Sequence, residues 1–171
     1  MAKSDSFFIR ATTSIGYDNT FRQESIDLGA YVDALGKSVL RIHNIAVSFT
    51  DDAGRSPELA GSDAAAAAQF QLTTQTALDI VLASNKSVIA SGMINAARVK
   101  SGSGVADSVS ESFDNLPQLW TNGYLVAVDT IYLGGAATST FDENVSVTVT
   151  MECTVESMSQ AAAMALALSQ Q

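Results

Sequence analysis

The stretch NVSVTVTMECTVE, residues 144–156, decides the fold class. Its odd-numbered positions from 145 to 155 are apolar, and its even-numbered positions from 146 to 154 are polar. Because successive side chains of a strand point to opposite faces, this alternation predicts a long β-strand with one buried and one exposed face. The β-branched valines and threonines favour the same structure.

The cysteine at position 153 occupies the apolar phase of that strand. It is the chain's one cysteine, so it forms no disulfide within the chain. A reactive thiol needs positively charged surroundings, and no basic residue flanks Cys153 in sequence. We therefore expect it to be a small, buried hydrophobic residue.

Working outward, other segments share the alternation or the β-branched composition of strands. We expect them at residues 7–13, within 21–32, at 39–50, from about 69 to 82, at 88–100 with a possible break at Gly92, and at 124–133. Residues 124–133 are apolar on both faces, which predicts a central strand that pairs antiparallel with 144–156.

Turn-forming residues separate these strands, at 14–20, 32–37 and 84–87. The alanines at 64–68 favour a helical turn or a loop. Residues 101–118 are polar and rich in Gly and Ser, and they are too long for a hairpin loop. We expect them to cross the top or the bottom of the fold.

Within residues 39–50 the apolar phase changes. Apolar residues occupy positions 40 and 42 and then positions 45, 47 and 49. A β-bulge at His43 and Asn44 would produce this one-residue slip. His43 is the single histidine, so a pH switch or a metal ligand is a second interpretation; no His, Cys or carboxylate cluster stands near it, and we expect a structural bulge residue.

The whole chain, residues 1–171, is expected to form one β-barrel domain. It would carry a polar N-terminal arm at 1–6 and a C-terminal helical tail at 157–171, with Ser157 or Ser159 as the N-cap. Met164, Leu166 and Leu168 of that helix would pack on the subunit or reach a neighbour. The helix is too short to span a membrane.

Composition narrows the function classes. Hydrophobic residues make up 47% of the chain and charged residues 16%, which excludes a disordered protein. The net charge of -9 argues against nucleic-acid binding because it repels phosphate. Low charge with high apolar content indicates contact with other subunits. The first residues lack the pattern of a secretory signal, so we expect the chain to be made and folded in the cytoplasm.

No catalytic constellation is expected. The sequence lacks zinc spacings, a nucleophile elbow and a phosphate loop, so we assign no catalytic, cofactor-binding or metal-binding residues and no enzymatic activity. Asp27 and Asp129 could still meet in space as a glycosidase-like pair.

A group of acids in the 51–67 loop could hold a Ca²⁺ ion, although it lacks the regular spacing of a calcium loop, and we expect solvated charges. These acids are Asp51, Asp52, Glu58 and Asp63.

About eight strands with long polar connections predict an all-β, antiparallel jelly-roll barrel or sandwich. Three segments, 22–49 (RQESIDLGAYVDALGKSVLRIHNIAVSF), 122–135 (NGYLVAVDTIYLGG) and 149–170 (VTMECTVESMSQAAAMALALSQ), resemble the single β-barrel major capsid proteins of tailless icosahedral viruses of archaea and some bacteria. The resemblance implies a virion shell subunit without cofactor. It would build capsomers with itself or with a larger β-barrel capsid protein, often around an internal membrane.

Two alternatives remain open. A sugar-binding or adhesive β-sandwich would use Trp120, Tyr124 and Tyr132 as a stacking platform, although aromatic residues beside a strand belong more often to the core. A non-capsid virion or tail component is the other. The sequence does not specify the host, the triangulation number or the edges that meet a neighbour.

Overall fold

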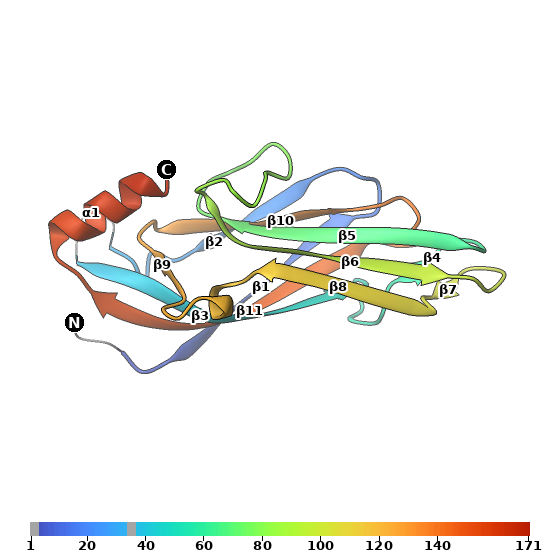
Figure 1. Ribbon diagram of the computed structural model, residues 1–171, viewed down its shortest axis with the longest axis horizontal. Helices are drawn as coiled ribbons and strands as arrows, with labels where there is room; N and C mark the ends of the chain where they lie inside the picture. Colours follow the sequence, from blue (N-terminus) through green and yellow to red (C-terminus); the bar gives the residue numbers. More distant parts are fainter. Residues whose placement is uncertain (1–3, 34–36) are drawn as a thin grey trace.

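Two antiparallel sheets pack face to face in the computed structural model, which describes residues 4–33 and 37–171 (Figure 1). Sheet A has the strand order β1 (Phe7–Gly16), β11 (Val145–Ser157), β3 (Ser38–Thr50) and β9 (Tyr124–Val126). Sheet B has the order β2 (Arg22–Asp27), β10 (Thr130–Ala137), β5 (Ala64–Thr73), β6 (Val88–Arg98) and β8 (Ser108–Asn115). The pair β4 (Glu58–Leu59) and β7 (Gly104–Val105), the 3-10 turn η1 (Pro117–Leu119) and the helix α1 (Gln160–Ser169) complete the fold.

The strand order is that of a jelly roll. The chain passes from sheet A to sheet B and back, with β1, β3, β9 and β11 in one sheet and β2, β5, β6 and β10 in the other. Strand β8 adds a fifth strand to sheet B as the second arm of a hairpin with β6. The expected all-β, antiparallel jelly-roll fold with a short C-terminal helix is therefore confirmed.

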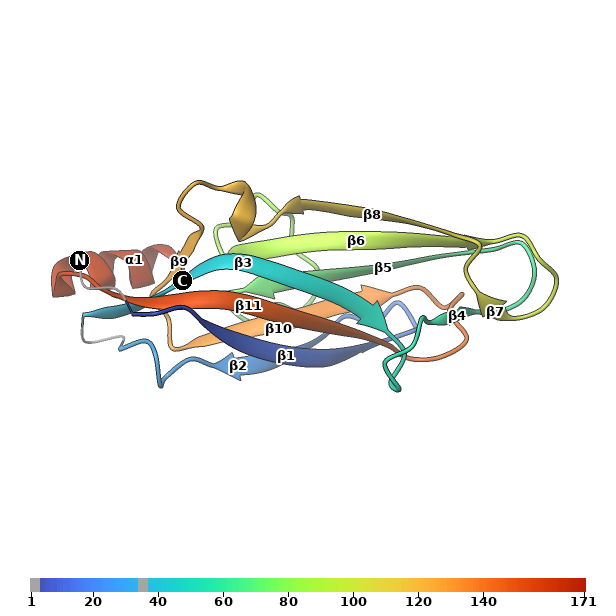
Figure 2. The ribbon, with the colours of Figure 1, turned by 90° about the horizontal axis from the view of Figure 1, so that it is seen from below.

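Strand β11 lies between β1 and β3 and supplies one wall of the core, as its alternation predicts (Figure 2). Its odd-numbered residues from Val145 to Cys153 are fully buried. Phe70 and Leu72 of β5 and Leu133 of β10 are buried in the same core from sheet B. Burying a side chain of this size contributes about 1.5–3 kcal/mol, so this contact surface between the sheets is the main stabilising feature.

Strand β5 corrects the prediction for residues 64–82. The alanines lie in the strand, not in a helical turn, and the strand ends at Thr73. Ala64, Ala66 and Ala68 are buried against the core, so tertiary burial overrides the helix propensity of alanine. The apolar residues beyond Thr73 leave the sheet, and Leu78 is fully exposed.

Residues 101–118 correct a second prediction, because they contain β7 and β8 in place of an irregular crossing. Strand β8 lies at the edge of sheet B and is largely exposed, so its polar sequence SVSESFDN is compatible with a strand there. Strand β6 is unbroken, but its register with β8 shifts at Gly92. A Cβ at Gly92 would lie 2.2 Å from Cδ1 of Phe113, so the glycine leaves room for that ring.

Residues 124–133 correct a third prediction. They form two strands in different sheets, β9 and β10, and neither pairs with β11. Between them the chain crosses from sheet A to sheet B through Ala127 and Val128, which are buried. Both faces of the segment are apolar because this crossing is buried.

The remaining expectations are met in part. Strand β2 occupies only 22–27 of the predicted 21–32, and β1 runs on into the predicted turn as far as Gly16. Residues 83–87 form the expected turn. Of the expected break at 32–37, residues 34–36 lie outside the described residues, as do residues 1–3 of the N-terminal arm. Helix α1 begins after Ser159, whose side chain accepts a hydrogen bond from the N–H of Ala162.

Candidate functional site

The outer face of sheet A is polar, and its side chains are bonded to one another. The outward-pointing residues of β11 contact neighbouring segments along most of the strand. The pairs are Ser146 with Asp52, Thr148 with Thr12, Glu152 with Asn44, Thr154 with His43, and Glu156 with Arg41. Most of the outward polar side chains of β11 therefore find hydrogen-bond partners within the chain.

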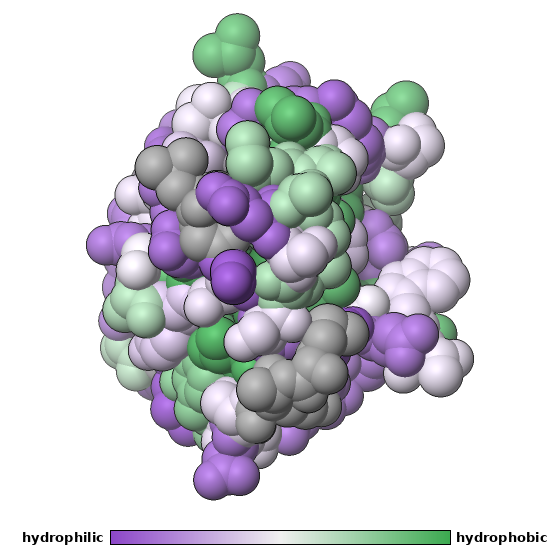
Figure 3. Space-filling model, turned by 90° about the vertical axis from the view of Figure 1, so that its left-hand side faces the viewer, coloured by the Kyte–Doolittle hydropathy of each residue, from purple (hydrophilic) through white to green (hydrophobic). Residues whose placement is uncertain are grey.

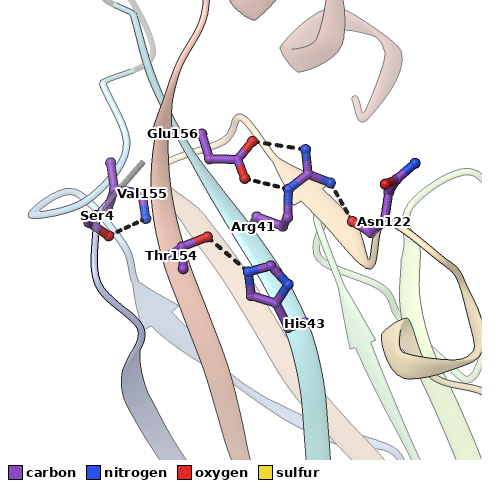
Figure 4. Close-up of polar contacts among 7 residues, drawn as sticks. All are labelled: Ser4, Arg41, His43, Asn122, Thr154, Val155 and Glu156. Carbon is purple, nitrogen blue, oxygen red and sulfur yellow. Dashed lines mark hydrogen bonds and ion pairs between the residues drawn. The ribbon is translucent and has the colours of Figure 1, made fainter. Parts of the chain in front are cut away.

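The ion pair of Arg41 and Glu156 anchors one end of this face (Figure 4). Arg41 donates to both oxygens of the Glu156 carboxylate, from Nε at 2.6 Å and from Nη2 at 2.8 Å, and also to the carbonyl of Asn122. Both side chains are largely buried. The Glu156 carboxylate raises the pKa of the Arg41 guanidinium by accepting these hydrogen bonds. The pair therefore ties β3, β11 and the segment before β9 together.

His43 is the bulged residue that the phase change predicts. In the register of β3 with β11, Ile42 pairs with Cys153 and Asn44 with Glu152, so His43 is the extra residue. Its Nε2 lies 2.9 Å from Oγ1 of Thr154 (Figure 4). The bulge interpretation is confirmed, and the described residues near His43 include no metal-ligand cluster.

Two of the four acids in the predicted 51–67 loop, Asp51 and Asp52, accept hydrogen bonds from other groups of the chain. The Asp51 carboxylate accepts hydrogen bonds from the backbone N–H groups of Ala53 and Arg55, and from Nε of Arg55 at 2.8 Å. These contacts, the backbone N–H of Arg55 first, hold the pKa of Asp51 below its ordinary value. Across residues 4–33 and 37–171, no three His, Cys, Asp or Glu side chains converge on a metal site.

Asp27 and Asp129 lie near each other at one end of the β2–β10 pairing, but they do not lie in a cleft. Asp27 pairs with Thr130, the neighbour of Asp129, where β2 meets β10. Both carboxylates are exposed, and that of Asp27 accepts the N–H of Gly29 at 2.7 Å. None of the cavities described below is lined by either residue.

Cys153 is fully buried between the sheets, as predicted. Burial raises the pKa of its thiol to about 12, so the thiol is protonated at neutral pH. A protonated, inaccessible thiol is neither a nucleophile nor a metal ligand.

The three aromatic residues of the sugar-binding alternative do not share one sheet. Tyr124 packs against the core from β9 of sheet A, and Tyr132 lies on β10 of sheet B. Trp120 follows η1 and is 57% exposed. Tyr124 and Tyr132 therefore belong to different layers of the sandwich, and a common stacking platform is not formed.

The central part of the outer face of sheet B differs from the outer face of sheet A because it carries no charged side chain. Paired positions on β10, β5, β6 and β8 bring small or neutral side chains together over its central part. These are Ala65, Ala67, Gln69, Met93, Asn95, Ala97, Ser108, Ser110, Ser112 and Ala136. We call this set the neutral face.

An ordered loop crosses the neutral face at one end. Residues 76–83, here called the ridge, stand out from the sheet between β5 and β6 (Figure 1). The side-chain amide of Gln23 bonds both the N–H and the carbonyl of Ala77, and the amide of Gln71 does the same for Val81. The ridge is thereby held against the sheet, with Leu78 and Leu82 102% and 80% exposed.

Beside the ridge the neutral face is hollowed. A cavity of about 390 Å³, here called the hollow, opens on this face. It is lined by Ala65, Ala67, Ala97, Asn95, Val109 and their neighbours. Two further cavities, of about 380 and 310 Å³, flank the ridge and share Gln69, Ile80 and Met93. The ridge and the hollow therefore belong to one continuous surface of sheet B.

The sequence does not reveal this surface. Its pattern predicts one strand over residues 69–82, which would place the leucines of the ridge in a sheet. The one signal in the sequence is the pair of threonines at 73 and 74, followed by a stretch in which Ala77 and Val81 interrupt the alternation. The glutamines that hold the ridge have no signal of their own. Gln23 lies 54 residues from Ala77, and Gln71 meets Val81, 10 residues away, only because the chain turns back over the sheet.

The end of the molecule that carries α1 shows apolar side chains interspersed with polar ones (Figure 3). Met164 and Leu168 of α1 are exposed, whereas Ala163 is buried. In the described part of the chain, no helix is both long enough and apolar enough to cross a membrane.

Comparison with known proteins gives no family. No protein-family model matches the chain, and no curated protein matches it. Among solved structures, one of desmodium yellow mottle tymovirus is similar over 90% of this chain and 89% of that chain, at 11% identity and a TM-score of 0.36. The unassembled pentamer of Merkel cell polyomavirus VP1 is similar over 88% and 95%, at 8% identity and a TM-score of 0.40. Similarity of this extent carries no argument about function.

Proposed function

We propose that this chain is a virion structural protein, a shell subunit that assembles with copies of itself into capsomers. The observation that carries the proposal is the contrast between the two outer faces of the jelly roll. Sheet A has a polar face on which most side chains of β11 form hydrogen bonds within the chain, whereas sheet B has a hollowed face with an uncharged central part beside exposed leucines. Such a molecule has one face suited to solvent and one suited to another protein surface.

The charge of the chain supports the same proposal. With a net charge of -9, two copies repel each other unless they meet through surfaces that lack acids. The neutral face offers such a surface, and association there is driven by burial of apolar area.

The finer form of the proposal is a single-barrel major capsid protein of a tailless icosahedral virus of archaea or bacteria. In this form the protein is made in the host cytoplasm and resides in the virion, in capsomers that include a larger β-barrel capsid protein or copies of this chain alone. It has no catalytic residue or cofactor and makes no direct contact with nucleic acid. An internal viral membrane could lie nearby.

The test is the mass and the shape of the purified full-length protein. Light scattering after size exclusion, followed by electron microscopy, should give defined multimers that grow into shells or patches of shell with concentration. A protein that remains monomeric at every concentration and salt level would contradict the proposal. Glycan-array binding that is lost in Trp120→Ala would instead support the adhesive alternative.

A further inference from the structure

We infer that the ridge of one copy docks into the hollow of a second copy, so that Leu78 and Leu82 are the side chains that join two subunits. The inference rests on the proposed function and names the surface through which two subunits would associate. Its partner is a second copy of this chain.

The ridge has the properties of a preformed binding element. Its backbone is fixed at two points by Gln23 and Gln71, and Thr74 at its base donates to the carbonyl of Gln170 at 2.6 Å. Little conformational entropy is therefore left to lose on binding. Leu78 and Leu82 are nonetheless exposed on this ordered segment, and exposed leucines on an ordered ridge mark a contact surface.

The hollow has the properties of the matching receptor. Its floor consists of alanine side chains, including Ala65, Ala67 and Ala97, and its wall includes Val109, which is half exposed. The volume of about 390 Å³ accommodates two leucine side chains. No charged side chain lines it, so an incoming leucine desolvates no ion.

A second copy is the occupant that carries both halves of the contact. The chain is acidic, so most surfaces of another copy are repelled, whereas the hollow has no charged lining and the one charged side chain of the ridge, Asp79, accepts the N–H of Ile80 at 2.7 Å. Ridge and hollow lie side by side on the same outer face of sheet B. A two-fold axis that lies in the plane of the contact, parallel to this face, brings the two faces together and places each ridge over the other copy's hollow, so one contact buries both.

Disulfide trapping tests the contact directly. Cys153 is buried and protonated, so introduced cysteines are the reactive ones. Leu78→Cys and Ala97→Cys variants, mixed and mildly oxidised, should give a covalent heterodimer at about tenfold the yield of a mixture of Val99→Cys and Ala97→Cys. Val99 is a matched control because it is an exposed apolar residue outside the ridge. Equal yields from the two mixtures would overturn the inference.

Charge substitution separates this inference from the proposed function. Leu78→Asp with Leu82→Asp should weaken self-association by about tenfold or more, while Val99→Asp leaves it unchanged. Unfolding midpoints of the monomers check that each variant is folded. If the wild type assembles and the ridge variant assembles equally well, or if Leu168→Asp on α1 abolishes assembly instead, the inference fails and the proposed function stands. If the wild type never associates, the proposed function fails as well.

Discussion

Arg41 and Glu156 illustrate how this chain treats its few charges: a charge that is buried is paired. The guanidinium and the carboxylate form two parallel hydrogen bonds, a geometry that favours Arg over Lys. Sequence alone did not identify the pair, since 115 residues separate the two partners.

We expect Arg41→Met to lower the free energy of unfolding by about 3 kcal/mol or more, because the Glu156 carboxylate loses its guanidinium while it stays buried. The double variant Arg41→Met, Glu156→Leu should recover most of that loss, since it removes both charges. Urea unfolding of the three proteins measures the effect. A double variant as unstable as the single one would show that the packing of Arg41, not its charge, is what matters.

Asp51 predicts an acid-sensitive contribution to stability. Its pKa is lowered from an ordinary value of 3.8, first by the backbone N–H of Arg55, so folding favours the ionised form. This stabilisation is complete above pH 3.8 and is lost as the pH falls through the lower pKa of the folded state. Between neutral pH and this range, wild type should therefore lose more stability than Asp51→Asn. Denaturant unfolding at a series of pH values measures the difference, and parallel curves would contradict it.

Glutamine side chains link the irregular segments of this fold to its regular elements. Gln23 and Gln71 hold the ridge. Gln118 bonds both the N–H and the carbonyl of Ile45 of β3, beyond the residues that pair with β9, and Gln170 bonds the N–H of Ala127 and the carbonyl of Leu125. A primary amide carries the same donor and acceptor as a peptide group, so each glutamine replaces a missing strand partner. These uncharged contacts are compatible with a chain of low charge content.

Removal of one such contact should free the ridge without unfolding the sheet. In Gln71→Ala, the N–H and carbonyl of Val81 lose their partner, at a cost of about 1–3 kcal/mol to the local structure. Hydrogen exchange followed by mass spectrometry should show faster exchange at residues 76–83 and unchanged protection of β5. Gln69→Ala, on the same strand and face, is the matched control. Equal protection of the ridge in both variants would contradict this role for Gln71.

The elements that could be predicted from the sequence are those whose own residues determine them. The alternation of 144–156 places β11, the phase change places the bulge at His43, and Ser159 begins α1. The elements that were missed depend on partners far away. Strand β8 is recognisable only beside β6, and the alanines of β5 become a strand only when the opposite sheet buries them. The candidate surface was missed for the same reason.

At the scale of the whole molecule, the two faces and the net charge act together. Because each copy carries a charge of -9, repulsion between copies opposes association, and dissolved salt screens it. Salt does not weaken a contact made through the neutral face, because that contact depends on burial of apolar area and not on charge.

Self-association should therefore strengthen as NaCl rises from about 0.05 to about 0.5 M, over which the screening length falls severalfold. Sedimentation velocity at fixed protein concentration measures the change. The same titration on Leu78→Asp with Leu82→Asp should show little gain, because the attractive contact is missing. Dissociation of the wild type by salt would indicate that charged groups, and not apolar ones, join the copies.

The position of β11 has a consequence for biosynthesis. Among the strands of these two sheets it is synthesised last, yet it fills the gap between β1 and β3. Until it emerges, those two earlier strands have unpaired edges and an uncovered apolar side, a state open to premature aggregation. Nascent chains halted before residue 145 are therefore expected to need a chaperone, whereas chains that include β11 close sheet A themselves.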